Sequence, residues 1–194
     1  ARLGSDPARL YADWLRETGR EREAETVYAC LARSALGLRR EFAGPVGERN
    51  VYELRPRGPV AAEAREAAAL AAQIGAILAT GNVAVIREGA PGEASLPATL
   101  APVVRPVPDP VGLPGIRAVL SDRTGADLVE LLRAVADRDG AIVPVLTPSP
   151  DGAGYDLDRL LEECATSTNT AAAGGNASLM SLGEGSVPTA AVRA

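Results

Sequence analysis

The chain has 194 residues, enough for one domain with a substantial core. Its formal net charge is −5, with acidic and basic residues interspersed, which excludes the basic surface that nucleic-acid binding needs. No apolar run comes near the ~20 residues that a membrane-spanning helix requires, and no charged-then-apolar signal segment stands at the front.

Two amphipathic helices are predicted in residues 1–43. Ser5, Asp6 and Pro7 form a cap with proline in the first helical turn. Apolar side chains then recur at helical spacing, at Leu10, Tyr11, Trp14 and Leu15, and after Gly19 at Ala24, Val27, Tyr28, Leu31 and Ala35. With Gly37 as the predicted end, the two helices form a hairpin that buries its apolar stripe on the main body.

Residues 44–165 are predicted to form the core of the domain. After the turn-rich segment 44–50, extended patterns cover residues 51–54, 58–61, 83–86, 103–107, 115–121 and 141–146, and helical patterns cover 62–80, 95–101, 124–140 and 155–164. Thr124 and Asp127 resemble a capping box, and Pro144 predicts an edge or bulge for the last strand. This alternation predicts an α/β fold, a Rossmann-like, mainly parallel sheet in three layers.

The segment 166–183 differs from the rest of the chain. It has small residues, the adjacent glycines Gly174 and Gly175, and side-chain amides, followed by a short apolar run. We expect close-packed irregular backbone from Ser167 onward. Residues 178–182 are predicted to form a β-flap, a strand that needs a partner edge. Residues 184–194 are interpreted as a tail.

No cofactor-binding or metal-binding residue is predicted. A dinucleotide fingerprint needs a G-x-G-x-x-G turn between a strand and a helix, and the first such passage, residues 59–63, has none. No helical pattern is predicted after Gly183 and Gly185, and the chain has no lysine for a phosphate loop. The absence of histidine excludes histidine metal sites and histidine acid–base chemistry. A nicotinamide-dinucleotide-binding module remains an alternative, because fold alone does not settle function.

Cys164 beside Glu162 and Glu163 is the one constellation that suggests catalysis, because aldehyde oxidation uses a thiolate and a glutamate base. Neighbouring carboxylates raise a thiol pKa, and no histidine is present to activate the sulfur. We therefore predict no catalytic residue and interpret Cys164 as a buried, inert side chain at a helix end. A degenerate aldehyde dehydrogenase is the alternative. Two isolated cysteines, Cys30 and Cys164, fit a reducing cytoplasm.

The segment 166–180, T-S-T-N-T-A-A-A-G-G-N-A-S-L-M, closely resembles the C-terminal motif of the proline utilization A (PutA) family. Residues 44–50, running into Tyr52 and 55–58, are similar to that family, and so are residues 75–82. Two departures are Val46, where threonine is common, and the extra tail 184–194. The resemblance covers most of the chain from about Gly44, and we expect it to extend to the leading helices.

Members of this family join a proline dehydrogenase to a glutamate semialdehyde (pyrroline-5-carboxylate) dehydrogenase, with FAD and NAD as cofactors. The resemblance implies that this chain is an extra C-terminal domain of the aldehyde dehydrogenase superfamily, without a cofactor of its own. Its flap would dock on the catalytic dehydrogenase domain of the same polypeptide and help to cover the substrate-channelling tunnel. The expected contact residues are Thr168, Asn169, Thr170, Gly174, Gly175, Asn176, Ser178, Leu179, Met180 and Leu182.

The chain, which starts at Ala1, is therefore expected to be a non-catalytic piece of a longer bacterial cytoplasmic polypeptide. That polypeptide would associate peripherally with a membrane only through its proline dehydrogenase. Without its partner, the flap of the isolated chain is expected either to be disordered or to pair with a neighbouring molecule.

Overall fold

A computed structural model describes residues 6–44 and 47–169. The chain divides into two units, the first formed by Ala1–Leu38 and Leu54–Glu162 and the second by Arg39–Glu53 and Glu163–Ala194. We call the first unit the body. The strands β1, β2 and β8 form a sheet of their own, which we call the arm sheet.

The body is built around a five-stranded sheet in the order β5-β4-β3-β6-β7, and every strand pair in it is parallel. The central strand β3 pairs with β4 on one side and β6 on the other, and four of its five residues are buried. The chain therefore adds β4 and β5 on one side of β3 and then β6 and β7 on the other side, as in doubly wound folds. This confirms the predicted Rossmann-like sheet. Its strands are β3 (Pro59–Glu63), β4 (Val83–Arg87), β5 (Val104–Val107), β6 (Ala118–Ser121) and β7 (Val145–Leu146).

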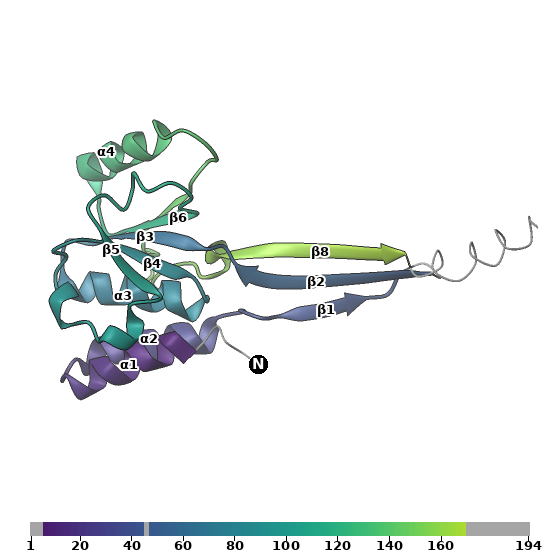
Figure 1. The fold of residues 1–194 in the computed structure, drawn as a ribbon, viewed down its shortest axis with the longest axis horizontal. Coiled ribbons are helices and arrows are strands. Elements are labelled where there is room, and N and C mark those ends of the chain that lie inside the picture. The colour runs from purple at the N-terminus through teal and green to yellow at the C-terminus, as the bar shows by residue number, and fades with distance from the viewer. Residues whose placement is uncertain (1–5, 45–46, 170–194) are drawn as a thin grey trace, which may run out of the picture. The chain divides into compact units, whose positions relative to one another are not determined.

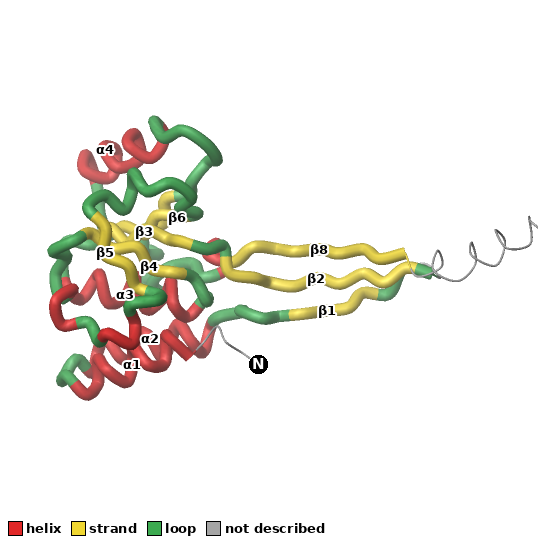
Figure 2. Tube along the Cα trace, in the orientation of Figure 1, coloured by secondary structure: helices red, strands yellow, loops and turns green. Residues whose placement is uncertain are grey.

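Helices cover both faces of this sheet, as Figures 1 and 2 show. One apolar cluster joins the sheet to α1, α2 and α3 and includes Leu15, Ile74 and Leu120; the other joins it to α4 and includes Val119 and Leu131. The predicted three layers are thus confirmed. The helices are α1 (Asp6–Glu17), α2 (Glu21–Arg33), α3 (Ala67–Ala79) and α4 (Gly125–Ala136).

The predicted helical hairpin is confirmed as α1 and α2, which bury their stripe on the body. Tyr11 and Val27 are almost fully buried, although Leu10, expected on the same stripe, is 52% exposed. Helix α2 ends at Arg33, before the predicted Gly37. At Gly75 of α3 an added Cβ would lie only 2.6 Å from Val27 Cγ2, so a glycine lets α2 and α3 approach closely.

The arm sheet has the order β1-β2-β8, with β1 (Arg39–Phe42) antiparallel to β2 (Glu48–Pro56). Part of the predicted connector 44–50 is therefore strand. The predicted helix 155–164 is wrong, because only Asp158–Leu160 forms a 3₁₀ turn, η3, and β8 runs from Leu161 to Asn169. The leucines that suggested a helix are buried at this turn, and pairing with β2 then outweighs local helix preference.

Other local predictions were confirmed only in part. The region 95–101 forms short 3₁₀ turns, η1 (Glu93–Ser95) and η2 (Ala98–Leu100), rather than a helix. Thr124 precedes α4 but makes no capping hydrogen bond with its side chain, so the predicted capping box is wrong. The edge position predicted from Pro144 is confirmed by β7 at the end of the sheet. Among the described residues, no helix has the length and apolarity to span a bilayer.

Candidate functional site

Charged side chains gather at the carboxyl edge of the body sheet. Glu63 is the last residue of β3, Arg87 is the last residue of β4, and Arg123 follows the end of β6 by two residues. Because these three strands are parallel neighbours, their carboxyl ends meet at one edge. Ligands of open α/β sheets bind at this edge, beside the central strand where the order reverses, so it is the first place to examine for function.

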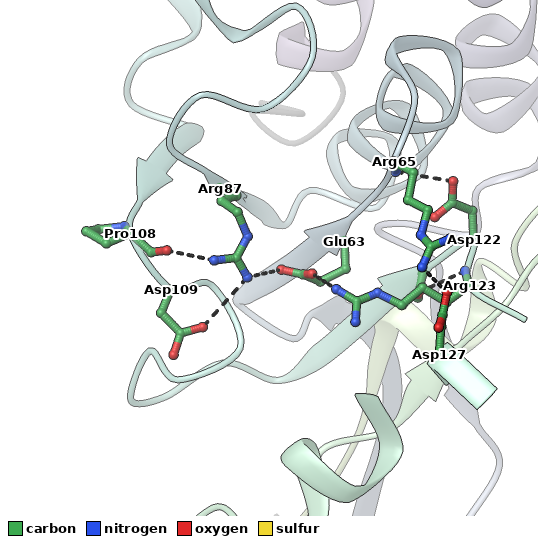
Figure 3. A network of polar contacts seen from close by, with 9 residues as sticks. Glu63, Arg65, Arg87, Pro108, Asp109, Asp122, Arg123 and Asp127 are labelled. Atoms are coloured by element: carbon green, nitrogen blue, oxygen red, sulfur yellow. Dashed lines mark hydrogen bonds and ion pairs between the residues drawn. The ribbon is translucent and has the colours of Figure 1, made fainter. Parts of the chain in front are cut away.

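The Glu63 carboxylate lies between two guanidinium groups, as Figure 3 shows. Its Oε1 is 3.1 Å from Arg87 Nη2, and its Oε2 is 2.6 Å from Arg123 Nη2. The Glu63 side chain is only 4% exposed, so these two partners replace the water that a buried carboxylate would otherwise need.

Further charged groups surround this pair of contacts (Figure 3). Arg87 Nη1 donates a hydrogen bond to the Pro108 carbonyl oxygen (2.9 Å), and its Nη2 lies 4.0 Å from Asp109 Oδ1. The Arg65 main-chain N–H donates to Asp122 Oδ2 over 3.3 Å, and the Arg65 guanidinium pairs with Asp127. A phosphate group arriving at this edge would therefore meet carboxylates already bound to the arginines.

A cavity of about 320 Å³ opens beside Glu63. Arg87, Arg123 and Arg138 line it together with the apolar side chains of Val111 and Leu131. Arg138 Nη2 donates to the Leu113 carbonyl oxygen over 3.0 Å, whereas its buried Nε has no partner among the described residues. The carboxylates of Glu63, Asp109 and Glu130 also line it, so the cavity combines three guanidinium groups and three carboxylates with an apolar wall.

The turn from β3 to α3 does not resemble a phosphate-binding turn. It consists of Ala64, Arg65 and Glu66, and α3 begins at Ala67 without a side-chain cap. A dinucleotide pyrophosphate needs glycines here, so that the backbone can approach it at the helix N-terminus. The missing glycines were noted from the sequence, whereas the Glu63 contacts were not predicted. A charged residue directly after each short apolar run, at Glu63 and Arg87, was the signal that could have revealed them.

The two cysteines occupy different environments. Cys164 lies within β8 and is half-buried, so the expectation of a buried cysteine at a helix end is wrong. Alternation along the strand directs Glu163 to the opposite face from Cys164. Cys30 is buried in α2, and burial raises the pKa of its thiol. A thiol with a raised pKa is a poor nucleophile at neutral pH.

The arm sheet carries ion pairs and aromatic side chains on its first two strands. Register places Arg39 opposite Glu53, with Arg39 Nε 3.8 Å from Glu53 Oε2, and Arg49 Nη2 lies 3.1 Å from Glu41 Oε2. The rings of Phe42 and Tyr52 meet edge-on with centroids 6.2 Å apart. Strands β1 and β8 are the two outer strands of this sheet.

Two of the predicted contact residues fall in the described part of the chain. Thr168 and Asn169 are the last residues of β8, and both are exposed; the backbone predicted to be irregular from Ser167 is strand as far as Asn169. The remaining predicted contacts and the flap strand 178–182 lie outside the described residues. They are Thr170, Gly174, Gly175, Asn176, Ser178, Leu179, Met180 and Leu182.

Curated relatives identify the family. The chain is 37% identical over 201 residues to the bifunctional protein PutA of Rhizobium meliloti, an alignment that covers 92% of this chain and 15% of that protein. It is 32% identical over 188 residues to the bifunctional protein PutA of Escherichia coli, covering 92% of this chain and 14% of that protein. This chain is a homologue of one segment of the PutA proteins. It spans about one seventh of the length of these PutA relatives.

Solved structures agree on the fold. A crystal structure of a Bradyrhizobium japonicum PutA variant matches with a TM-score of 0.52 at 20% identity, covering 74% of this chain and 19% of that one. A 3,6-anhydro-L-galactose dehydrogenase matches with a TM-score of 0.53 at 21% identity, covering 76% and 39%. Protein-family models give no match. The body therefore has the Rossmann-like fold of aldehyde-dehydrogenase-type proteins, within a segment related to PutA.

Proposed function

We propose that this chain is a non-catalytic docking domain of a bifunctional PutA polypeptide. It docks on the catalytic dehydrogenase domain of the same polypeptide, covers the substrate-channelling tunnel and supports oxidation of glutamate semialdehyde to glutamate. In this proposal FAD and NAD belong to the longer polypeptide and none binds here. Residues 166–183 form the docking segment, as predicted from their resemblance to the PutA motif.

The observation that carries this proposal is the arm sheet. Within the described residues, β1 and β8 each pair only with β2, so both are edge strands of this sheet, the kind of strand to which a further strand can be added. Seven of the nine residues of β8 are exposed, and all four residues of β1 are. Such a sheet buries little apolar area of its own, and a further strand or surface can add main-chain hydrogen bonds to it.

The carboxyl edge of the body supports a role without cofactor. There Glu63 and its two arginines occupy the place that a dinucleotide takes in related folds, and the turn after β3 has no glycine. The chain has no histidine, and the Cys30 thiol is buried with a raised pKa. These features favour a domain that acts through shape and backbone contacts.

Deletion within the longer polypeptide tests this proposal. Removing residues 168–182 should abolish most semialdehyde dehydrogenase activity and introduce a lag into proline-to-glutamate turnover. Proline dehydrogenase activity, measured with an artificial electron acceptor, should persist. Removing residues 184–194 is the matched control and should leave all three measurements unchanged. Coupled turnover without a lag after the first deletion would rule the proposal out.

Two further measurements separate the alternatives. Equilibrium dialysis of the 194-residue chain with NAD tests for a dinucleotide-binding module, and we expect no saturable binding. Aldehyde oxidation by the same chain tests for a degenerate aldehyde dehydrogenase, and we expect none. Activity that disappears in Cys164→Ala would instead assign catalysis to this chain.

A further inference from the structure

Two arginines hold the Glu63 carboxylate in the way that arginines hold a bound oxyanion. Each carboxylate oxygen faces a different guanidinium group, at 3.1 Å from Arg87 and 2.6 Å from Arg123. The carboxylate is 4% exposed, whereas Arg87 and Arg123 are 49% and 27% exposed. The anion is therefore enclosed while the cations around it remain reachable from solvent.

The position of this carboxylate matches that of a ligand rather than that of an ordinary surface ion pair. Residue 63 stands at the carboxyl end of the central strand, where neighbouring strands lead away in both directions. Anions bind at this point in open α/β sheets. Arg138, whose buried Nε lacks a partner among the described residues, lines the same 320 Å³ cavity as Glu63.

We infer that the carboxyl edge of the sheet is an oxyanion site for phosphate, and that the protein fills it with its own Glu63 carboxylate. Glu63 then determines specificity, because its negative charge satisfies Arg87 and Arg123 and repels an incoming phosphate. Removing the carboxylate leaves Arg123 without its counter-ion and leaves Arg87 with only the longer, 4.0 Å contact to the exposed Asp109, beside the existing cavity. Arginine forks bind phosphate well, so the vacated site should accept inorganic phosphate. This assignment goes beyond docking and does not depend on it.

Titration calorimetry with inorganic phosphate, at constant ionic strength, tests the assignment on the 194-residue chain. Glu63→Ala should bind phosphate with one site and at least about tenfold more tightly than the unaltered chain, a difference that one charge-assisted contact can supply. The double variant Glu63→Ala/Arg123→Ala should lose this gain. Glu41→Ala is the matched control, since Glu41 also pairs with an arginine but lies in the arm sheet, and it should gain no site.

Glu63→Gln keeps the side-chain volume and removes only the charge, so it provides a second test if Glu63→Ala fails to fold. We expect this variant to bind phosphate more tightly than the unaltered chain and, where both fold, less tightly than Glu63→Ala. Circular dichroism establishes that each variant is folded. Folded Glu63 variants that bind phosphate no better than the unaltered chain would overturn the assignment. Equal binding by Glu63→Ala and the double variant would overturn it as well.

Discussion

The Asn82 side chain donates a hydrogen bond from Nδ2 to the main-chain oxygen of Leu160 over 2.8 Å. The same Nδ2 donates to Thr80 Oγ1 (2.8 Å), and Oδ1 accepts from the Gly58 main-chain N–H (2.8 Å). Asn82 is 2% exposed, so its amide is almost fully used within the body. One side chain thus joins the residue before β3 to the residue before β8, two segments that are distant in sequence.

Replacing Asn82 by alanine should destabilise the chain by about 3 kcal/mol, because the half-buried Gly58 N–H and the buried Leu160 carbonyl oxygen both lose this hydrogen-bond partner. Urea unfolding followed by circular dichroism measures this loss. Hydrogen exchange should also become faster near Leu161, where β8 begins. Thr99→Ala, at an exposed position, is the control and should change stability by less than about 0.5 kcal/mol. An equal effect of both substitutions would show that the Asn82 contacts contribute nothing.

Glu63→Ala should also destabilise the chain, by on the order of 3 kcal/mol, because two arginines lose a buried counter-ion. Glu41→Ala removes a carboxylate with a similar arginine contact at an exposed position, so its effect on unfolding should be small. Raising the salt concentration should weaken the Glu41 contribution and leave the Glu63 contribution nearly unchanged. Urea unfolding at low and high salt gives both comparisons. Similar losses for the two variants would contradict the difference in burial.

The two cysteines should react with iodoacetamide at different rates. At pH 8, Cys164 should be alkylated at least about tenfold faster than Cys30, because Cys30 is buried and burial raises the pKa of its thiol. Mass spectrometry of peptides sampled over time measures both rates in one experiment. In Cys164→Ser the fast phase should vanish. A fast reaction at Cys30 would mean that α2 opens readily from the body.

Tyr155 should ionise late in an alkaline titration. Burial raises the pKa of its phenol to about 12, from an ordinary value near 10, and its oxygen accepts a hydrogen bond from Gln73 Nε2 over 3.0 Å. The unfolded chain therefore loses this proton at a lower pH than the folded chain. The resulting stabilisation is complete below about pH 10 and is lost as the pH rises towards 12. Ultraviolet absorbance of Tyr155→Phe, compared with the unaltered chain, should lack one late-ionising phenol; an unchanged curve would contradict this.

The fold was largely predictable because its signals are local and regular. Apolar runs such as residues 83–86 are strands buried on both faces, and the stripes of α1 and α2 follow the helical repeat. The region 155–164 misled the prediction because Leu157, Leu160 and Leu161 fit a helical spacing. All three are buried, yet they line a turn and the start of β8. Short apolar patterns do not distinguish these cases.

The α/β class and the helical hairpin could be predicted from periodicity, which is a property of neighbouring residues. The resemblance to PutA came from the order of residues in one segment, 166–180, and needed no structure. The contacts of Glu63 with Arg87 and Arg123, and the pairing of β8 with β2, became visible only in the folded chain. Parallel strands bring their carboxyl ends together across crossovers of tens of residues, and strand pairing depends on a partner distant in sequence. Patterns among neighbouring residues therefore predict neither which strand ends meet nor which strands pair.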